Sequence, residues 1–136
     1  MTCELCATDG GTVLWRDETV RVVHVADPDH PAFCRVILNR HVAEMTDLPP
    51  AERERVMGCV WAVERALRTL VAPAKINLAS LGNMTPHVHW HVIARFADDP
   101  HFPNPVWGPR VRAGAARSLP GFGERLAALL QASPAG

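Results

Sequence analysis

The sequence predicts a single α+β domain in which one long helix packs on one face of an antiparallel sheet. Two observations support this fold class: short apolar runs bounded by turn residues, and one long amphipathic segment between them. Their order is a hairpin, a strand, the long helix and two further strands, which is typical of α+β domains. With 136 residues, the chain is expected to form one domain over residues 1–136.

The first strands are expected before the long helix. Apolar runs at residues 12–15 and 19–25 suit a β-hairpin across residues 16–18, and residues 33–39 are typical of a buried strand. Two closely spaced prolines make residues 27–31 a loop, because proline cannot donate to a strand ladder.

The long helix is expected to begin after Asp47, as an acidic cap followed by prolines, and to end near Val71, before Pro73. Its apolar positions recur at helical spacing: Val56, Val60, Val63, Leu67 and Leu70. Cys59 lies beside this stripe, so we expect a buried structural thiol.

Two strands should follow the helix, at residues 75–81 and 87–96, with a tight connection over residues 82–86. A proline-rich tail begins at about residue 98, and a short C-terminal helix is expected over residues 122–130.

Composition and charge exclude several classes of function. The chain has 14 basic and 14 acidic residues, with no basic patch or stripe, so nucleic-acid binding is not expected. No apolar run is long enough for a membrane span, and no signal peptide is recognisable. Four cysteines without a secretory signal predict thiols in a reducing compartment. The sequence therefore predicts a cytoplasmic protein.

The most informative segment contains three histidines at alternate positions: His87, His89 and His91. On a strand, alternate side chains share one face and lie roughly 6.5 to 7 Å apart. Imidazole can serve as metal ligand, general acid or base, or nucleophile. The outer pair would be roughly 13 Å apart, too far to share one metal ion, so at least one histidine has another role.

Cys3 and Cys6 form a second constellation. Their C-x-x-C spacing lets both thiolates reach one zinc ion, but two more ligands are then needed, and plain thiols or redox chemistry remain alternatives. A thioredoxin-like interpretation fails, because no βαβ unit surrounds the motif. The remaining ligands would come from the other histidines: His24, His30, His41, His87 and His101.

The run from His87 to Ile93 resembles the His-φ-His-φ-His-φ-φ signature of the histidine triad (HIT) superfamily of nucleotide hydrolases and transferases. Residues 35–48 and 76–83 also resemble family segments: a strand leading to the long helix, and the strand and phosphate-binding turn before the triad. Trp90, followed by Val-Ile-x-Arg, is most similar to branches that act on diadenosine polyphosphates. The resemblance covers residues 3–107 and implies a HIT-like fold and a homodimer.

The resemblance implies a role for each histidine of the triad. His89 matches the family nucleophile, which attacks the α-phosphorus of a nucleotide and forms a covalent nucleotidyl-histidine. His91 would support the phosphoryl group. Three further residues are expected to bind the nucleotide or its phosphates: Asn77 in the preceding strand, and Asn83 and Thr85 in the phosphate-binding turn.

In zinc-bearing branches, the cysteine pair is completed by a histidine before the helix and by the first histidine of the triad. On this chain the four ligands would be Cys3, Cys6, His41 and His87, holding a structural zinc. Where relatives hold the ribose with an acidic residue, this chain has Val25. Asp27, two residues further on, is the expected substitute.

The resemblance implies a small-molecule nucleotide substrate: a diadenosine polyphosphate first, an adenosine phosphoramidate next. Two alternatives remain, a nucleotide-binding or interaction protein with little turnover, and a zinc hydrolase with metal-bound water at His87 and His89. The other residues have ordinary expected roles. His24, His30 and His101 are expected at the surface or in loops, Arg40 and Arg95 in solvated ion pairs, Trp15 and Trp61 in the core, and Trp107 in packing or covering the site.

Overall fold

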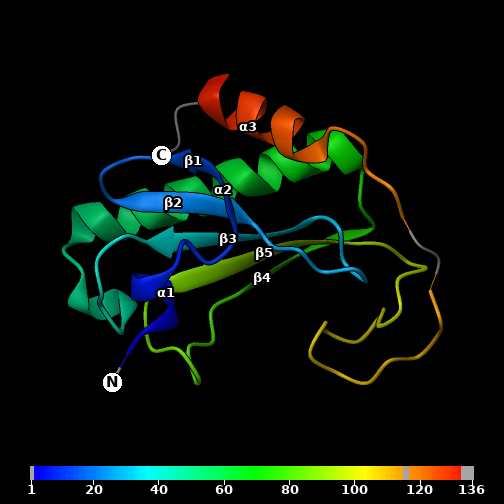
Figure 1. Ribbon diagram of the computed structural model, residues 1–136, viewed down its shortest axis with the longest axis horizontal. Helices are drawn as coiled ribbons and strands as arrows, with labels where there is room; N and C mark the ends of the chain where they lie inside the picture. The colour runs from blue at the N-terminus through cyan, green and yellow to red at the C-terminus, as the bar shows by residue number, and fades with distance from the viewer. Residues whose placement is uncertain (1, 115–116, 133–136) are drawn as a thin grey trace.

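The computed structural model describes residues 2–114 and 117–132 and confirms the predicted α+β fold. Within these residues, five strands form one antiparallel sheet in the order β1-β2-β3-β5-β4 (Figure 1). The strands span Thr12–Arg16 (β1), Val20–His24 (β2), Phe33–Leu38 (β3), Lys75–Ala79 (β4) and His89–Arg95 (β5). Strand β5 therefore lies inside the sheet, between β3 and β4.

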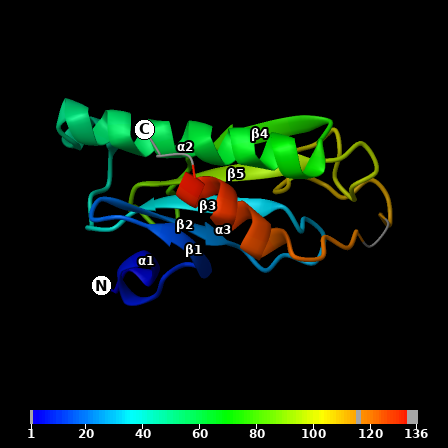
Figure 2. The same cartoon turned by 90° about the horizontal axis from the view of Figure 1, so that it is seen from above.

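Two helices, α2 (Pro50–Val71) and α3 (Phe122–Ala132), lie on one side of the sheet, and the one-turn helix α1 (Glu4–Ala7) lies on the other (Figure 2). The long helix α2 covers one face, and the C-terminal helix α3 packs against α2 and β1. The main apolar core fills the α2 side, and a small cluster of Leu5, Val23 and Ile37 packs under α1. We call the side opposite α2 the histidine face.

Strand β5 begins at His89, so the prediction that it begins at His87 was wrong. At His87 the chain forms a bend before the strand begins, and the amide of His87 donates to the carbonyl of Thr85 at 2.8 Å. This local bond turns the chain immediately before the ladder with β3 begins. The bend changes the direction of the first histidine relative to the other two.

The helix start also differs from the prediction. Asp47 ends a short 3-10 helix, Met45–Asp47, and Pro49 is the N-cap of α2, without a side-chain cap. Pro50 occupies the first helical position, which suits its fixed φ angle and missing N–H. Helix α1 was not predicted, because four residues are too short to show helical periodicity.

Two side chains expected in the core differ from each other. Trp61, on α2, is 51% exposed, so the prediction of a core position was wrong. Trp15 is half-buried against the main core. Cys59 is fully buried as expected, and burial raises the pKa of its thiol to about 12. None of the described helices has the length and apolar character needed to cross a membrane.

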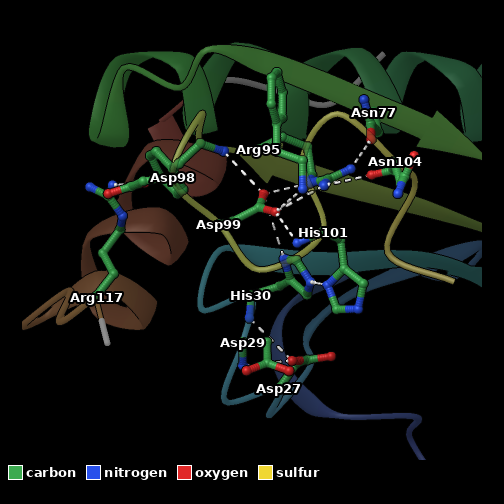
Figure 3. A network of polar contacts seen from close by, with 12 residues as sticks. Asp27, Asp29, His30, Asn77, Arg95, Asp98, Asp99, His101, Asn104 and Arg117 are labelled. Atoms are coloured by element: carbon green, nitrogen blue, oxygen red, sulfur yellow. Dashed lines mark hydrogen bonds and ion pairs between the residues drawn. The ribbon is translucent and has the colours of Figure 1, made fainter. Parts of the chain in front are cut away.

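Residues 96–114 form an irregular segment, the C-terminal strap, which begins at a buried ion pair (Figure 3). The carboxylate of Asp99 accepts from Arg95 Nε at 2.8 Å and Nη2 at 3.0 Å. It also accepts from the amides of His101 and Phe102. Burial alone would raise the pKa of Asp99, but these bonds outweigh it and hold the pKa well below its usual range.

This network contradicts the expectation that Arg95 forms a solvated ion pair. Arg95 is 1% exposed rather than solvated, because Asp99 neutralises its charge inside the protein. His30 lies in a loop, as predicted, but is buried there, with its Nε2 at 3.0 Å from Nδ1 of His101 (Figure 3). Arg40 does form the expected surface ion pair, with Glu52. The network therefore ties the strap to β5 and to the loop between β2 and β3.

Replacing Asp99 with Asn should lower the free energy of unfolding by about 3 to 5 kcal/mol, because Arg95 would keep a buried, unpaired charge. Asp98→Asn is the matched control. Asp98 pairs with Arg117 at the surface, where such pairs are worth less than about 1 kcal/mol. Urea unfolding at neutral pH measures both, and equal losses would contradict this account of the network.

The difference in unfolding free energy between the native protein and Asp99→Asn should depend on pH, because the pKa of Asp99 is lowered in the folded state. The carboxylate stabilises the fold above its unfolded-state pKa, near 4, and this contribution is lost as pH falls further. The stability gap between the native protein and Asp99→Asn should therefore be constant near neutral pH and shrink below about pH 4.

Candidate active site and metal centre

The alternation of β5 places two of the three histidines on the histidine face. His89 and His91 are 8% and 6% exposed, and their rings meet edge to face with centroids 5.1 Å apart. Trp90 and Val92 point the other way and belong to the core beneath α2. The predicted shared face therefore holds for the second and third histidines of the triad.

The tautomer of His89 follows from one hydrogen bond. Its Nδ1 lies 2.6 Å from the carbonyl oxygen of His87. A carbonyl can only accept, so Nδ1 carries the proton and donates it to this bond. In the neutral ring, the other nitrogen, Nε2, is then unprotonated and has a lone pair available. The arrangement leaves His89 able to act as a nucleophile.

His91 lies in a mostly aromatic environment. Its ring packs edge to face against Phe33 at 5.5 Å and Trp107 at 5.0 Å between centroids. Burial, then His89, then the cationic Arg35 lower the pKa of His91 to about 4. Its Nδ1 is buried and bonds to no atom of the described residues. His91 is therefore a neutral imidazole at physiological pH.

The second constellation of the sequence forms a compact cluster. Within the described residues, one ligand atom from each of Cys3, Cys6, His41 and His87 lies within 4.8 Å of the others. The Sγ atoms of Cys3 and Cys6 are 3.4 and 3.5 Å from Nδ1 of His87, and Cys6 Sγ is 3.4 Å from Nδ1 of His41. Tetrahedral zinc with its usual bond lengths separates sulfur and nitrogen ligands by about 3.5 Å. The cluster therefore has the size of a zinc site.

The tautomer of His87 also suits a metal ligand. Its Nε2 lies 2.6 Å from the carbonyl oxygen of Leu38 and must donate to it. Nδ1 is then the unprotonated nitrogen, and it is the one that faces both cysteines. A hydrogen bond of this kind to the second ring nitrogen is the usual way in which proteins orient a histidine ligand. The bend before β5 turns this ring toward the cysteines.

The loop between β4 and β5 carries two of the predicted phosphate-binding residues. Asn83 is exposed and Thr85 is half-buried. Gly82 precedes them with a φ of +74°, a left-handed conformation that favours glycine. Thr85 also borders a cavity of about 340 Å³ beside Cys3 and His41. The loop thus leads directly from β4 past the metal cluster to the first histidine of the triad.

The other two predicted nucleotide-binding residues, Asn77 and Asp27, form hydrogen bonds within the protein. Asn77, on β4, accepts a hydrogen bond from Arg95 at 2.8 Å (Figure 3). One carboxylate oxygen of Asp27 accepts from the amides of Asp29 and His30, so Asp27 closes its own loop after β2. Neither residue has a hydrogen bond to the triad.

Two further residues, Arg35 and Trp107, lie next to the triad on this face, and the sequence did not predict their positions. Arg35 is directly opposite His91 in the β3–β5 ladder. The sequence signal that could have identified Arg35 is its charge, since the rest of its strand is apolar. Trp107 was weighed as a packing or covering residue, and its contact with His91 places it over the site while it stays 51% exposed. The sequence could not show this contact, because the strap has no periodic pattern.

Known proteins share the fold of this chain and part of its sequence. The model of the HIT domain family matches residues 9–98. A curated relative named AP-4-A phosphorylase, from Mycobacterium tuberculosis, is 26% identical over 107 residues, which cover 74% of this chain and 55% of the relative. The chain thus spans about half the length of the curated relatives that it matches.

Solved structures show the same fold. A histidine triad protein from Bradyrhizobium japonicum has a TM-score of 0.73 and 27% identity, covering 90% of both chains. One from Marinobacter aquaeolei has a TM-score of 0.73 and 26% identity, covering 97% of this chain and 93% of that one. A zinc-bound histidine triad protein from Mycobacterium smegmatis has a TM-score of 0.67 and 21% identity, covering 97% and 95%. The family model covers well over half of the chain, and the chain therefore belongs to the HIT domain family.

Proposed function

We propose that the protein is a nucleotide hydrolase or transferase that cleaves at the α-phosphate of a nucleotide conjugate through a covalent nucleotidyl-histidine. The observation that carries this proposal is the tautomer of His89, whose bond to the carbonyl of His87 leaves Nε2 unprotonated. Membership of the HIT family and similarity to an AP-4-A phosphorylase support nucleotide chemistry.

The proposed reaction has two steps. The lone pair on His89 Nε2 attacks the α-phosphorus, the bond to the leaving oxygen breaks, and the leaving group takes that electron pair. Water or another acceptor then attacks the phosphorus and loses its proton to solvent. The bond between phosphorus and Nε2 breaks with its electron pair on nitrogen, which releases the nucleotide and restores the neutral imidazole. The bond to the His87 carbonyl holds the ring in place and stabilises the positive charge that it gains during attack.

The remaining predicted residues are assigned to binding. His91 lies next to His89 and would contact the phosphoryl oxygens, while the loop with Asn83 and Thr85 would supply amide and side-chain donors. Asp27 retains one carboxylate oxygen outside its loop bonds, which suits a ribose hydroxyl. Asn77 would act indirectly, through Arg95.

A diadenosine polyphosphate is our first choice of substrate, and an adenosine phosphoramidate is the second. The name of the Mycobacterium tuberculosis relative favours the first. A metal-bound water between His87 and His89 is not supported, because His87 directs Nδ1 at the cysteines while His89 donates Nδ1 to a carbonyl. The alternative is a nucleotide-binding protein with little turnover, and activity measurements distinguish it from an enzyme.

Replacing His89 with Ala should reduce turnover on the order of a thousandfold or more, because the nucleophile is lost. Product formation from a panel of dinucleotides and phosphoramidates measures this in samples of equal folded content. His24→Ala is the matched control, since His24 packs against Phe122 of α3 rather than against the triad, and it should retain turnover. Equal turnover in the native protein and His89→Ala would contradict the mechanism, and absence of turnover in both would favour the binding protein.

The same proposal includes a structural zinc held by Cys3, Cys6, His41 and His87. The spacing of the donors and the tautomer of His87 support it, and a zinc-bound relative has the same fold. Four protein ligands would close the site, so the ion would bind the N-terminal segment to the start of β5 rather than activate water.

The native protein should contain one zinc per chain, and Cys3→Ser should lose it together with a large part of its thermal stability. Metal analysis and thermal unfolding measure the two effects. Cys59→Ala is the matched control, because it removes a buried cysteine from the core and should lower stability while the zinc content is kept. Full zinc content in Cys3→Ser would refute the assignment.

His91 should titrate near pH 4, well below an ordinary histidine, because burial, His89 and Arg35 lower its pKa. NMR of the ring resonances, assigned with His91→Gln, measures the midpoint. Because the folded state resists protonation of His91, this residue should disfavour the folded state progressively as pH falls from about 6.5 toward 4. A midpoint near 6.5 would show that the ring is more solvated than the structure implies.

We also propose that the protein is a cytoplasmic homodimer. Strand β4 is an edge of the sheet, and Leu78 on this strand and Leu81 beyond it are 38% and 55% exposed. Such an apolar edge is suited to burial against a second copy of the chain. The four cysteines are free, as a reducing compartment would keep them.

A further inference from the structure

Three buried side-chain nitrogens beside the triad have no hydrogen-bond partner among the described residues. Nε1 of Trp90 lies on the core side of β5, whereas Nε of Arg35 and Nδ1 of His91 lie on the histidine face. The two residues are direct partners in the β3–β5 ladder, so their side chains leave the same face of the sheet about 5 Å apart. Buried polar atoms are nearly always bonded, and leaving one unbonded costs about 1 to 3 kcal/mol. Two neighbouring exceptions in one site point to a ligand that would bond to both.

The charge of Arg35 indicates the nature of that ligand. Its guanidinium donates through Nη1 to the carbonyl of Gly10 at 2.9 Å, and no carboxylate of the described residues pairs with it. Six other arginines do pair with carboxylates: Arg16, Arg40, Arg55, Arg95, Arg110 and Arg117. The neighbouring His91 is neutral at physiological pH, because burial, His89 and Arg35 lower its pKa to about 4. One uncompensated cation next to a neutral imidazole favours an anion.

The position of Arg35 relative to the nucleophile limits which anion this is. His89 pairs with Ile37, so Arg35 is its diagonal neighbour on the adjacent strand. Diagonal neighbours lie roughly 7 to 8 Å apart, within reach of a long side chain. Arg35 is therefore near enough to His89 for its side chain to reach a phosphoryl group next to the one that His89 attacks. Trp107 packs on the ring of His91 and bounds this space with an aromatic wall.

We propose that Arg35, together with His91, binds the phosphoryl group next to the one attacked by His89 and thereby selects substrates with a polyphosphate leaving group. This inference rests on the proposed function and names its substrate class. When the bond between the α-phosphorus and the bridging oxygen breaks, that oxygen leaves with the electron pair, and Arg35 stabilises the negative charge on the departing phosphate.

The same chemistry separates the two candidate substrates. An amine leaving from a phosphoramidate must gain a proton, and the guanidinium of Arg35 cannot supply one, because arginine side chains do not deprotonate in proteins. A phosphate leaving group requires positive charge and no proton. Arg35 should therefore accelerate polyphosphate cleavage and have little effect on phosphoramidate cleavage.

The first test compares kcat/KM of the native protein and Arg35→Gln for diadenosine tetraphosphate and adenosine 5′-phosphoramidate. Loss of one charge-assisted contact should reduce the tetraphosphate value about tenfold to a hundredfold, and the phosphoramidate value should change less than about threefold. The phosphoramidate rate also reports on folding of the variant. Arg65→Gln, which removes an exposed arginine from α2, is the matched control and should change neither value.

Equal loss of both activities would overturn the proposal, since Arg35 would then contact the α-phosphate or hold the fold through Gly10. Unchanged activity on the tetraphosphate would overturn it as well.

The second test measures binding and does not depend on turnover. Calorimetry should show that ADP binds the native protein at least about tenfold more tightly than AMP, and that this ratio falls to about one in Arg35→Gln. Equal affinities in the native protein, or a ratio that persists in the variant, would refute the role of Arg35. A native protein that binds both nucleotides without turning over either substrate would instead refute the enzymatic function alone. A native protein that binds neither nucleotide would overturn both.

Discussion

The site depends on the bonds made by His87, the residue at the bend before β5. Its Nε2 donates to the carbonyl of Leu38 on β3, which turns Nδ1 toward the cysteine pair. Its own carbonyl accepts from Nδ1 of His89 and sets the tautomer of that ring. His87 therefore faces the cysteines of the candidate metal site and also orients His89, the candidate nucleophile. Both bonds are to backbone carbonyls, one at the end of β3 and one at the bend before β5, rather than to flexible side chains.

In the proposed mechanism, this coupling would give the N-terminal segment an indirect role, without contact with the substrate. Cys3 and Cys6 face His87, and Leu5 between them packs on Val23 and Ile37 of the sheet. An ion bound by the cluster would hold His87 in position and, through its carbonyl, His89. The relation between metal content and activity would then be indirect, as expected of a structural site.

The opposite end of β5 has a different anchor. Arg95 and Asp99 form a buried pair that starts the C-terminal strap, and the strap returns to place Trp107 against His91. The pair is stable inside the protein because Asp99 accepts several further donors, which satisfy a carboxylate that would otherwise be costly to bury. The histidine face is thus bounded by the cysteine segment at one end and by the strap at the other. Arg35 lies between them, with its charge uncompensated.

The sequence by itself determined the fold class, the strands and the pairing of His89 with His91 on one face. These follow from local periodicity, which each segment carries within its own residues. It also indicated the four candidate metal ligands, but only through resemblance to a family, because Cys3 and His87 are 84 residues apart in the chain. Spacing between such distant residues contains no local signal.

Only the tertiary structure decided the bend at His87, the burial of Arg95 and His30, and the position of Arg35 beside His91. Each depends on a partner from another strand or loop: Leu38 for His87, Asp99 for Arg95, and the β3–β5 register for Arg35. A charged residue looks solvated in a sequence until its buried counter-charge is known. The pattern of one strand likewise cannot show which residue of its neighbour lies opposite, because register is set when the strands pair.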